Sequence, residues 1–282
     1  MHRKPRGDKM EIRKKQKFYA GVLLLWSIVA CLAAVPFVNE VERSIDTGQN
    51  FILSILLIFN AVFILYFWLN ATKDIVYTFY FWLNRKKFDS EIKMIDTIQV
   101  AGTDRVVLLY TTCDDFIEDS LLQSIQQDYD NFYTVILDDS RTEEYKNMVD
   151  RFVSEYNGVY CDIFVVRRNS SKGFKAGNLN NYLVGNKEYD YFVILDSDEI
   201  IPNNFIKQSL KYFAYYSNAG IVQGNHISTR NLNKFMSELS IGVDSHWDTY
   251  QSVKHKHGFM SFLGHGAMIS RECFEATGKF PE

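Results

Sequence analysis

The sequence predicts an α/β domain with a mixed sheet, preceded by two transmembrane helices, and two patterns lead to this fold class. The first is a pair of long uncharged stretches near the N-terminus, residues 18–38 and 51–69. The second is a regular alternation of strand-like and helix-like segments after residue 105, typical of a parallel or mixed sheet with helices on both faces. Hydrophobic residues make up 47% of the 282 positions and only four are proline, which excludes a disordered chain.

Each uncharged stretch is long enough to cross a bilayer, because helical residues rise about 1.5 Å each and the hydrocarbon core is about 30 Å thick. Eight Lys or Arg residues precede the first stretch, and Arg85, Lys86 and Lys87 follow the second. The positive-inside rule therefore predicts that the basic tail, residues 1–17, and everything after residue 70 are cytoplasmic. We expect a multi-pass protein of the cell (inner or plasma) membrane that contacts membrane lipid.

Residues 75–83 are aromatic and apolar but too short to span, so we expect an interfacial helix there, completing a membrane region over 18–87. Residues 88–104 then form a linker to the domain at 105–282. Two alternatives exist for the uncharged stretches. The first stretch could be a cleaved signal peptide ending near Cys31, although the second stretch argues against this. Both could instead be core helices of a soluble protein, although such helices usually keep some polar positions.

Charge is distributed unevenly along the chain. Residues 1–87 contain 13 basic and 6 acidic residues, a net charge of +7, whereas residues 88–282 contain 18 and 28, a net charge of −10. An acidic domain argues against a nucleic-acid partner, because phosphate contacts need a basic surface. The four cysteines lie far apart without a C-x-x-C pair, so they predict neither a zinc site nor a disulfide framework.

Five strands and four intervening helices are expected in the domain. The strands are predicted at 105–111, 132–138, 161–166, 191–195 and 220–223, and the helices at 117–127, 143–156, 175–184 and 203–216. In such folds, ligands bind beyond the carboxyl ends of the strands. The residues that directly follow each strand are therefore the candidates for a binding site.

Polar side chains follow four of these strands. Thr111 ends the first strand, Asp138 and Asp139 end the second, Arg168 follows the third, and Asp196 and Asp198 follow the fourth. Each motif alone is more often a turn or a surface loop. Four of them at the same edge of one sheet favour a ligand site instead.

A nucleoside-diphosphate sugar suits these residue types. Its departing pyrophosphate must be neutralised, which a divalent cation such as Mg²⁺ or Mn²⁺ on few carboxylates achieves. Asp196 and Asp198 point the same way in an extended segment, so one can reach a ribose hydroxyl and the other the metal. Lys175 supplies further positive charge. Asp138 or Asp139 can accept hydrogen bonds from a base edge.

Several motifs follow one another in a fixed order. They are D-D-S at 138–140, K-A-G-N-L-N at 175–180, D-S-D at 196–198, V-Q at 222–223, F-L-G-H-G-A at 262–267, then Arg271 and G-K-F-P-E at 278–282. Together they resemble the family 2 glycosyltransferases of GT-A fold, in particular the membrane-embedded branch that includes cellulose, chitin and hyaluronan synthases. The resemblance covers about residues 105–282.

The resemblance implies a role for each matching residue. Donor-nucleotide contacts are implied for Thr111, Asp138, Asp139, Lys175, Asn178 and Asp196, the metal ligand is Asp198, and the acceptor side is formed by Gly264, His265, Gly266 and Arg271. The implied reaction transfers a sugar, with inversion, from a nucleotide-sugar donor (a UDP-sugar) to a polysaccharide or glycolipid acceptor, with a divalent cation as cofactor.

The sequence also departs from the family pattern. Tyr110 stands where the family has proline, and Thr112-Cys113 replaces Tyr-Asn. The family's general base lies in a T-E-D motif, which we expect beyond Glu282. We therefore expect no catalytic base in this chain and a domain that is incomplete at its C-terminus. The alternative function is a catalytically incomplete fragment or pseudoenzyme that binds nucleotide sugar or serves as a membrane-bound partner. A sugar-phosphate nucleotidyltransferase is disfavoured, because residues 111–116 contain no glycine for a triphosphate loop.

Overall fold

The computed structural model describes residues 6–46, 51–227, 233–257 and 260–282. They belong to two compact units. The first unit comprises Met1–Phe88 and Ile227–Met260, and the second comprises Asp89–His226 and Ser261–Glu282.

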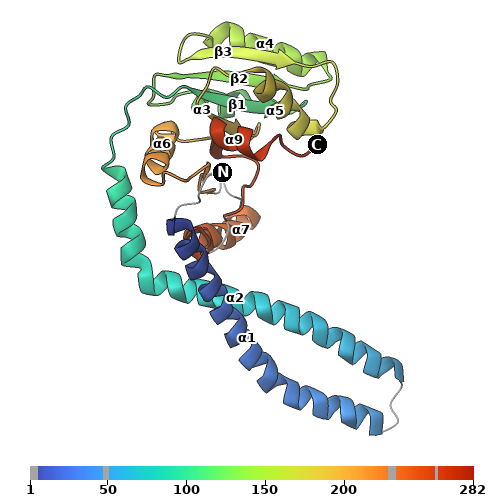
Figure 1. The fold of residues 1–282 in the computed structure, drawn as a ribbon. Helices are drawn as coiled ribbons and strands as arrows, with labels where there is room; N and C mark the ends of the chain where they lie inside the picture. The colour runs from blue at the N-terminus through green and yellow to red at the C-terminus, as the bar shows by residue number, and fades with distance from the viewer. Residues whose placement is uncertain (1–5, 47–50, 228–232, 258–259) are drawn as a thin grey trace. The chain divides into compact units, whose positions relative to one another are not determined.

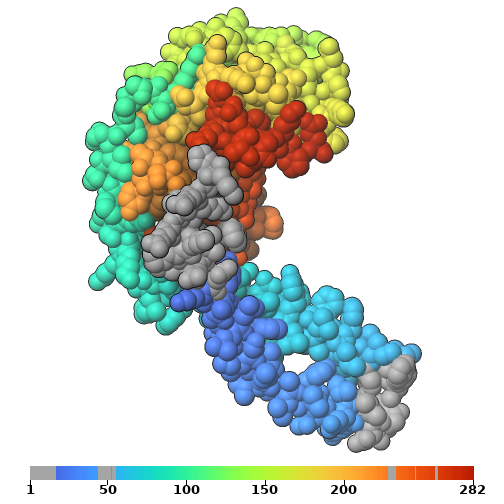
Figure 2. Space-filling view, viewed as in Figure 1, coloured from blue at the N-terminus to red at the C-terminus, as the bar shows by residue number. Residues whose placement is uncertain are grey.

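Two long helices dominate the first unit, α1 (Arg6–Asp46) and α2 (Phe51–Asp96), whose last residues from Asp89 onward belong to the second unit (Figure 1). By length and composition, both contain segments able to cross a membrane. Many of their large apolar side chains are exposed; Leu24, Leu32 and Phe67 are each more than 60% exposed. Figure 2 shows the surface of these helices in blue and cyan. Water is a poor solvent for such a surface. The two predicted long apolar helices are therefore present.

Helix α2 differs from the prediction at its C-terminal half. The segment 75–83, expected as a separate interfacial helix, and residues 88–96, expected as linker, both continue the same helix. Residues 70–96 contain neither glycine nor proline, so no residue interrupts the helical backbone. Only residues 97–105 are left as an irregular connection before the sheet.

The first unit also contains α7 (Lys234–Ser245), a π-helix η1 (His246–Gln251) and α8 (Ser252–His257). Aromatic contacts join them to the long helices. The ring of His257 stacks on Phe18 with centroids 4.4 Å apart, and Tyr250 lies 4.9 Å from Tyr77. The Tyr77 hydroxyl donates a hydrogen bond to the Tyr19 hydroxyl at 2.8 Å.

The second unit is built on a six-stranded mixed sheet with the order β3-β2-β1-β4-β6-β5. Its strands are β1 (Val106–Thr112), β2 (Phe132–Asp138), β3 (Asp162–Arg167), β4 (Tyr191–Leu195), β5 (Ile221–Gln223) and β6 (Ala267–Ser270). Strands β1 to β4 are parallel to one another, whereas β6 runs antiparallel to both of its neighbours, β4 and β5. Figure 1 shows β1, β2 and β3 side by side.

Alternate residues of the sheet feed two separate hydrophobic cores. Val106, Leu108 and Tyr110 of β1 pack on one face, with residues of α3 (Glu118–Ser124), α4 (Glu143–Tyr156) and α6 (Phe205–Tyr215). Val107 and Leu109 pack on the other face, with residues of α5 (Phe174–Gly185) and α9 (Arg271–Thr277). Because both faces are covered, the central strands are apolar throughout.

The predicted α/β class, with a mixed sheet and helices on both faces, is confirmed. The five expected strands and four expected helices are all present, with ends that differ by at most a few residues. Strand β6 and helix α9 were not expected, because four and seven residues are too few to show a clear hydrophobic period.

Candidate active site

The carboxyl ends of the parallel strands meet at one edge of the sheet. In the strand register, Thr112 of β1 pairs with Asp138 of β2, and Asp138 pairs with Arg167 of β3. Tyr110 pairs with Leu195, the last residue of β4. The polar residues that follow these four strands are therefore neighbours, as the sequence predicted.

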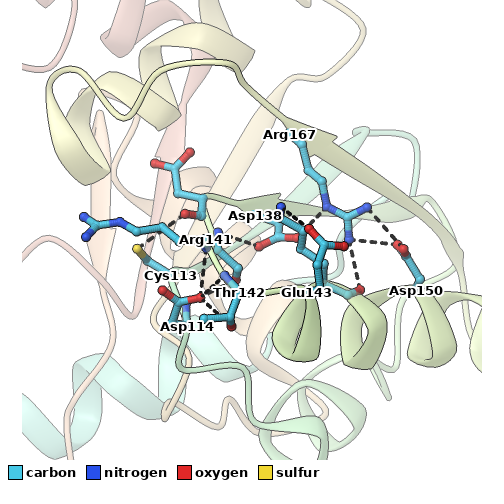
Figure 3. A network of polar contacts seen from close by, with 11 residues as sticks. Cys113, Asp114, Asp138, Arg141, Thr142, Glu143, Asp150 and Arg167 are labelled. Atoms are coloured by element: carbon cyan, nitrogen blue, oxygen red, sulfur yellow. Dashed lines mark hydrogen bonds and ion pairs between the residues drawn. The ribbon is translucent and has the colours of Figure 1, made fainter.

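Asp138 is buried at this edge and both of its oxygens have partners (Figure 3). Its Oδ2 accepts a hydrogen bond from Nε of Arg167 at 2.6 Å, and its Oδ1 accepts one from the backbone N–H of Ser140 at 2.9 Å. Arg167 also donates to Asp150 of α4 at 2.8 Å. Asp138 thus fixes the end of β2 to β3 and α4, and is less accessible to a nucleotide than Asp139.

The turn after β1 is fixed by Asp114, a non-glycine residue with a left-handed backbone (φ 59°). Its Oδ1 accepts hydrogen bonds from the backbone N–H groups of Arg141 and Thr142 and from the Thr142 hydroxyl, at 2.9–3.0 Å (Figure 3). These bonds hold the pKa of the Asp114 carboxyl below its usual value, and the bond from the Thr142 N–H contributes most. The turns after β1 and β2 are therefore tied to each other.

Asp139 forms a bidentate ion pair with Arg168, and both side chains are about nine-tenths buried. Arg168 Nε donates to Oδ1 at 2.8 Å, and Nη2 donates to Oδ2. Arg168 also donates to the carbonyl oxygens of Lys172 at 2.6 Å and Phe174 at 2.8 Å. One guanidinium therefore joins the end of β2 to the loop that leads into α5.

Lys175 and Asp196 form an ion pair at the end of β4. The Lys175 ammonium also donates to the carbonyl oxygen of Gly264 at 3.0 Å. Thr111 lies beside Asp196, and its hydroxyl donates to the Leu195 carbonyl at 3.0 Å. Three of the predicted donor-site residues are thus in one group.

Asp198 is exposed at the same edge and, within the described ranges, makes no hydrogen bond or ion pair. Ser197, between the two aspartates, is buried, and its hydroxyl donates to Asp115 at 2.8 Å. This bond turns Ser197 inward and leaves the Asp198 carboxylate accessible. Asn178 of α5 is buried, and its Oδ1 has no hydrogen-bond partner in the part of the chain that the structure describes.

The predicted acceptor-side residues separate into two groups. Gly264, His265 and Gly266 precede β6, and the Gly266 N–H donates to the Ile194 carbonyl at 2.8 Å, so they lie at the carboxyl edge. Arg271 follows β6 and donates to Lys187 at the opposite edge. The antiparallel direction of β6 causes this separation. Arg271 therefore lies apart from the other three residues, and the acceptor-side role of the group stays a prediction.

Two further residues of this edge, Glu199 and His226, were not anticipated. Oε2 of Glu199 lies 3.3 Å from Nδ1 of His265, and Oε1 lies 3.9 Å from Nε2 of His226. Burial raises the pKa of Glu199, although His265 opposes this effect, and burial lowers the pKa of His226. The sequence offers one signal for Glu199, which directly follows D-S-D; His226 lies in an irregular segment with no motif.

The edge therefore combines an accessible carboxylate, that of Asp198, with the lysine Lys175 and with the buried ion pair of Arg168 and Asp139. Carboxylates are the ligands that Mg²⁺ and Mn²⁺ prefer, so the exposed Asp198 fits a hard divalent cation. Lys175 can exchange its bond with Asp196 for one to an anionic ligand. This combination suits a ligand that carries both phosphate groups and hydroxyls.

Comparison with known proteins gives one family. The family model described as glycosyl transferase family 2 matches residues 106–278, more than half of the chain. Two curated relatives are each 26% identical to it: a probable glucomannan 4-beta-mannosyltransferase 10 of Arabidopsis thaliana over 156 residues, and a probable glucomannan 4-beta-mannosyltransferase 7 of Oryza sativa subsp. japonica over 139 residues. These matches cover 53% and 48% of this chain but only 28% and 24% of the relatives.

Solved structures also resemble this chain. The mannosyltransferase PcManGT of Pyrobaculum calidifontis, in complex with GDP-mannose and Mn²⁺, has a TM-score of 0.49 at 20% identity and covers 74% of this chain and 58% of its own. Residues 1–349 of S. aureus TarS have a TM-score of 0.42 at 13% identity and cover 61% of this chain and 49% of their own. The family assignment is based on the family model together with the sheet described above.

Proposed function

This chain belongs to glycosyl transferase family 2, and on that premise we propose that it transfers a hexose from a nucleoside-diphosphate sugar to a polysaccharide or glycolipid acceptor at a membrane. The observation that carries the proposal is the charged group at the carboxyl edge: Lys175 paired with Asp196, beside the exposed carboxylate of Asp198. The names of the two plant relatives support a polysaccharide acceptor and a mannose-type sugar.

In this proposal Asp198 holds a divalent cation, which neutralises the charge of the departing nucleoside diphosphate. Lys175 binds a phosphate oxygen, and Asp196, released from Lys175, accepts a hydrogen bond from a ribose hydroxyl. Asp139 contacts the base: a carboxylate has about four lone-pair sites, so its oxygens can accept another hydrogen bond while Arg168 holds them in place. Asn178 provides a buried amide oxygen that a ligand or a water molecule can satisfy.

The donor site is tested by isothermal titration of the whole chain in detergent with UDP and with GDP, each with and without Mn²⁺. We expect one nucleotide to bind, with an affinity that Mn²⁺ increases. D198N should abolish the Mn²⁺ effect. D130N is the matched control, because Asp130 is also exposed but precedes β2, at the opposite end of that strand. If D198N binds nucleotide with Mn²⁺ as tightly as the wild type does, the metal assignment is incorrect.

Transfer itself is tested with radiolabelled nucleotide sugars and the membranes that contain the chain. K175A and D196N should each lower incorporation into polymer or lipid about 100-fold or more, the usual effect of removing a group that stabilises transition-state charge. Nucleotide binding without transfer would support the binding-protein alternative.

We also propose that α1 and α2 cross a membrane and that the sheet lies on its cytoplasmic side. Their outward apolar side chains and the basic residues on both sides of them support this. Cys113 is exposed at the donor edge, so an impermeant maleimide should label it in inverted vesicles and not in right-side-out ones. C113S measures the labelling that comes from the other cysteines. If Cys113 is labelled only in right-side-out vesicles, the sheet lies on the opposite side of the membrane from the one proposed.

A further inference from the structure

Three side chains from separate segments converge at the carboxyl edge beside Asp196. Glu199 follows β4, His226 follows β5 and His265 precedes β6. One ligand atom from each residue lies within 4.8 Å of the others. The two imidazole rings have centroids 4.6 Å apart, and the Glu199 carboxylate faces both.

One imidazole nitrogen of this cluster lacks a well-formed hydrogen bond. Among the described residues, His265 Nδ1 is buried and makes no well-formed hydrogen bond; Glu199 Oε2 lies 3.3 Å away as an ion-pair partner. Buried polar atoms without partners are rare in proteins and each calls for an explanation, for which an ion is one candidate. An ion bound between the carboxylate and the imidazole would use this lone pair.

Gly266 is what allows the cluster to close. Its backbone is left-handed (φ 59°), and a Cβ at this position would lie 2.3 Å from Glu199 Oε1 and 2.7 Å from His226 Nε2. Any residue with a side chain would therefore push apart two of the three groups. Gly266 therefore serves two purposes: it adopts a left-handed backbone that other residues rarely adopt, and it leaves room for Glu199 and His226 to lie close together.

Gln223, the last residue of β5, supports the histidines from behind. Its amide nitrogen donates to the carbonyl oxygens of His265 at 2.9 Å and Gly266 at 3.1 Å, and its Oε1 accepts from the Leu263 N–H. The same nitrogen lies 3.3 Å from His226 Nε2. Because the two carbonyls can take both amide hydrogens, Gln223 stays satisfied if His226 gives its lone pair to an ion.

We propose that Glu199, His226 and His265 bind one first-row transition-metal ion of the zinc class, at a site separate from any ion held by Asp198. Two imidazoles and one carboxylate form a ligand set that zinc uses when it keeps an open position. Mg²⁺ prefers oxygen ligands alone. The ion joins the ends of three segments and fixes the 264–266 turn, whose Gly264 carbonyl accepts the Lys175 hydrogen bond.

The test uses Co²⁺ as a spectroscopic substitute for Zn²⁺, on the whole tag-free chain in detergent and without nucleotide. We expect one equivalent to bind, with visible absorption that indicates nitrogen ligation and that Zn²⁺ but not excess Mg²⁺ displaces. H226A and H265A should each weaken binding about 100-fold, since even supporting residues of metal sites are worth 10- to 100-fold. A wild-type chain that binds no Co²⁺ at one equivalent would overturn the proposal.

Matched variants separate this site from the donor site. H255A removes a histidine of α8, outside the cluster, and should leave Co²⁺ binding unchanged, as should D198N. Conversely, D198N should lose the Mn²⁺ effect on nucleotide binding, and far-UV circular dichroism equal to that of the wild type shows that H226A and H265A fold. Co²⁺ binding that D198N abolishes, or that H226A and H265A leave intact, contradicts the proposed ligand set. The outcome does not depend on whether the chain transfers sugar.

Discussion

Replacing Gly177 by alanine has two opposite effects on stability. Alanine favours the helical backbone of α5, whereas its added Cβ clashes with neighbouring atoms. Gly177 is buried in α5, and a Cβ there would lie 2.1 Å from the carbonyl oxygen of Lys172 and 2.9 Å from Nη1 of Arg168. That carbonyl oxygen accepts the Arg168 hydrogen bond at 2.6 Å. The clash is with backbone, so the loop before α5 must move and the Arg168 bond must lengthen or break.

The magnitude follows from three contributions. Alanine in a helix gains about 0.5–1 kcal/mol over glycine. Overpacking costs about 1–3 kcal/mol, and losing a hydrogen bond from a charged group costs about 1.5–3 kcal/mol. The net result is a destabilisation of about 1.5–5.5 kcal/mol. For a domain of this size, that lowers Tm by roughly 3–22 °C.

The assay is thermal unfolding of the whole chain in detergent, followed by intrinsic fluorescence. G185A is the matched control, because Gly185 ends the same helix and no atom lies within 4 Å of the position of its Cβ. We expect G185A to melt at or slightly above the wild-type temperature. If G177A also melts at or above that temperature, the Lys172 carbonyl is free to move and the packing argument is refuted.

Three further predictions concern single contacts. R168K keeps the charge but loses the bidentate pair with Asp139, so we expect nucleotide binding to weaken about tenfold in titration calorimetry, about 1.4 kcal/mol, and an unchanged affinity would contradict the role of this pair. N180A removes the amide that bonds both the N–H and the carbonyl of Phe280, so unfolding by denaturant should show a loss of about 1–3 kcal/mol; no loss would mean that this segment is held elsewhere. Burial raises the pKa of Cys161 to about 11, so at pH 8 its thiolate fraction is about 200-fold below that of an ordinary thiol. Iodoacetamide alkylation followed by mass spectrometry should therefore be slow and accelerate about tenfold per pH unit up to pH 10, whereas rapid labelling at pH 8 would show that the thiol is not buried.

Residue type and order were enough to predict most of the sheet and its polar edge. Long apolar strands such as 132–138 have a clear pattern, and a parallel sheet necessarily brings their carboxyl ends together. The group of Thr111, Lys175 and Asp196 was therefore predictable without coordinates. The exposed position of Asp198 follows from the same alternation that turns Ser197 inward.

The remaining features depend on contacts between segments far apart in the chain. No local pattern shows that β6 runs antiparallel, and this direction is what separates Arg271 from Gly264. Which aspartate pairs with which arginine depends on the contact between β2 and the end of β3: Arg167 binds Asp138, and Arg168, the residue after β3, binds Asp139. The cluster of Glu199, His226 and His265 forms because β5 pairs with β6. These strands have three and four residues, too few for a sequence pattern to predict their pairing.

The reversed strand β6 has a mechanical consequence. It is four residues long, about 13 Å, and is hydrogen-bonded to a neighbour on each side, so it behaves as a short stiff rod across the sheet. Gly266 sits at its donor end, and Arg271, whose N–H bonds the Asp190 carbonyl at 2.9 Å, anchors the other end. Loss of the Arg271 contacts would therefore move β6 and, with it, the turn whose Gly264 carbonyl binds Lys175. No residue of the carboxyl edge would need to be changed for this effect.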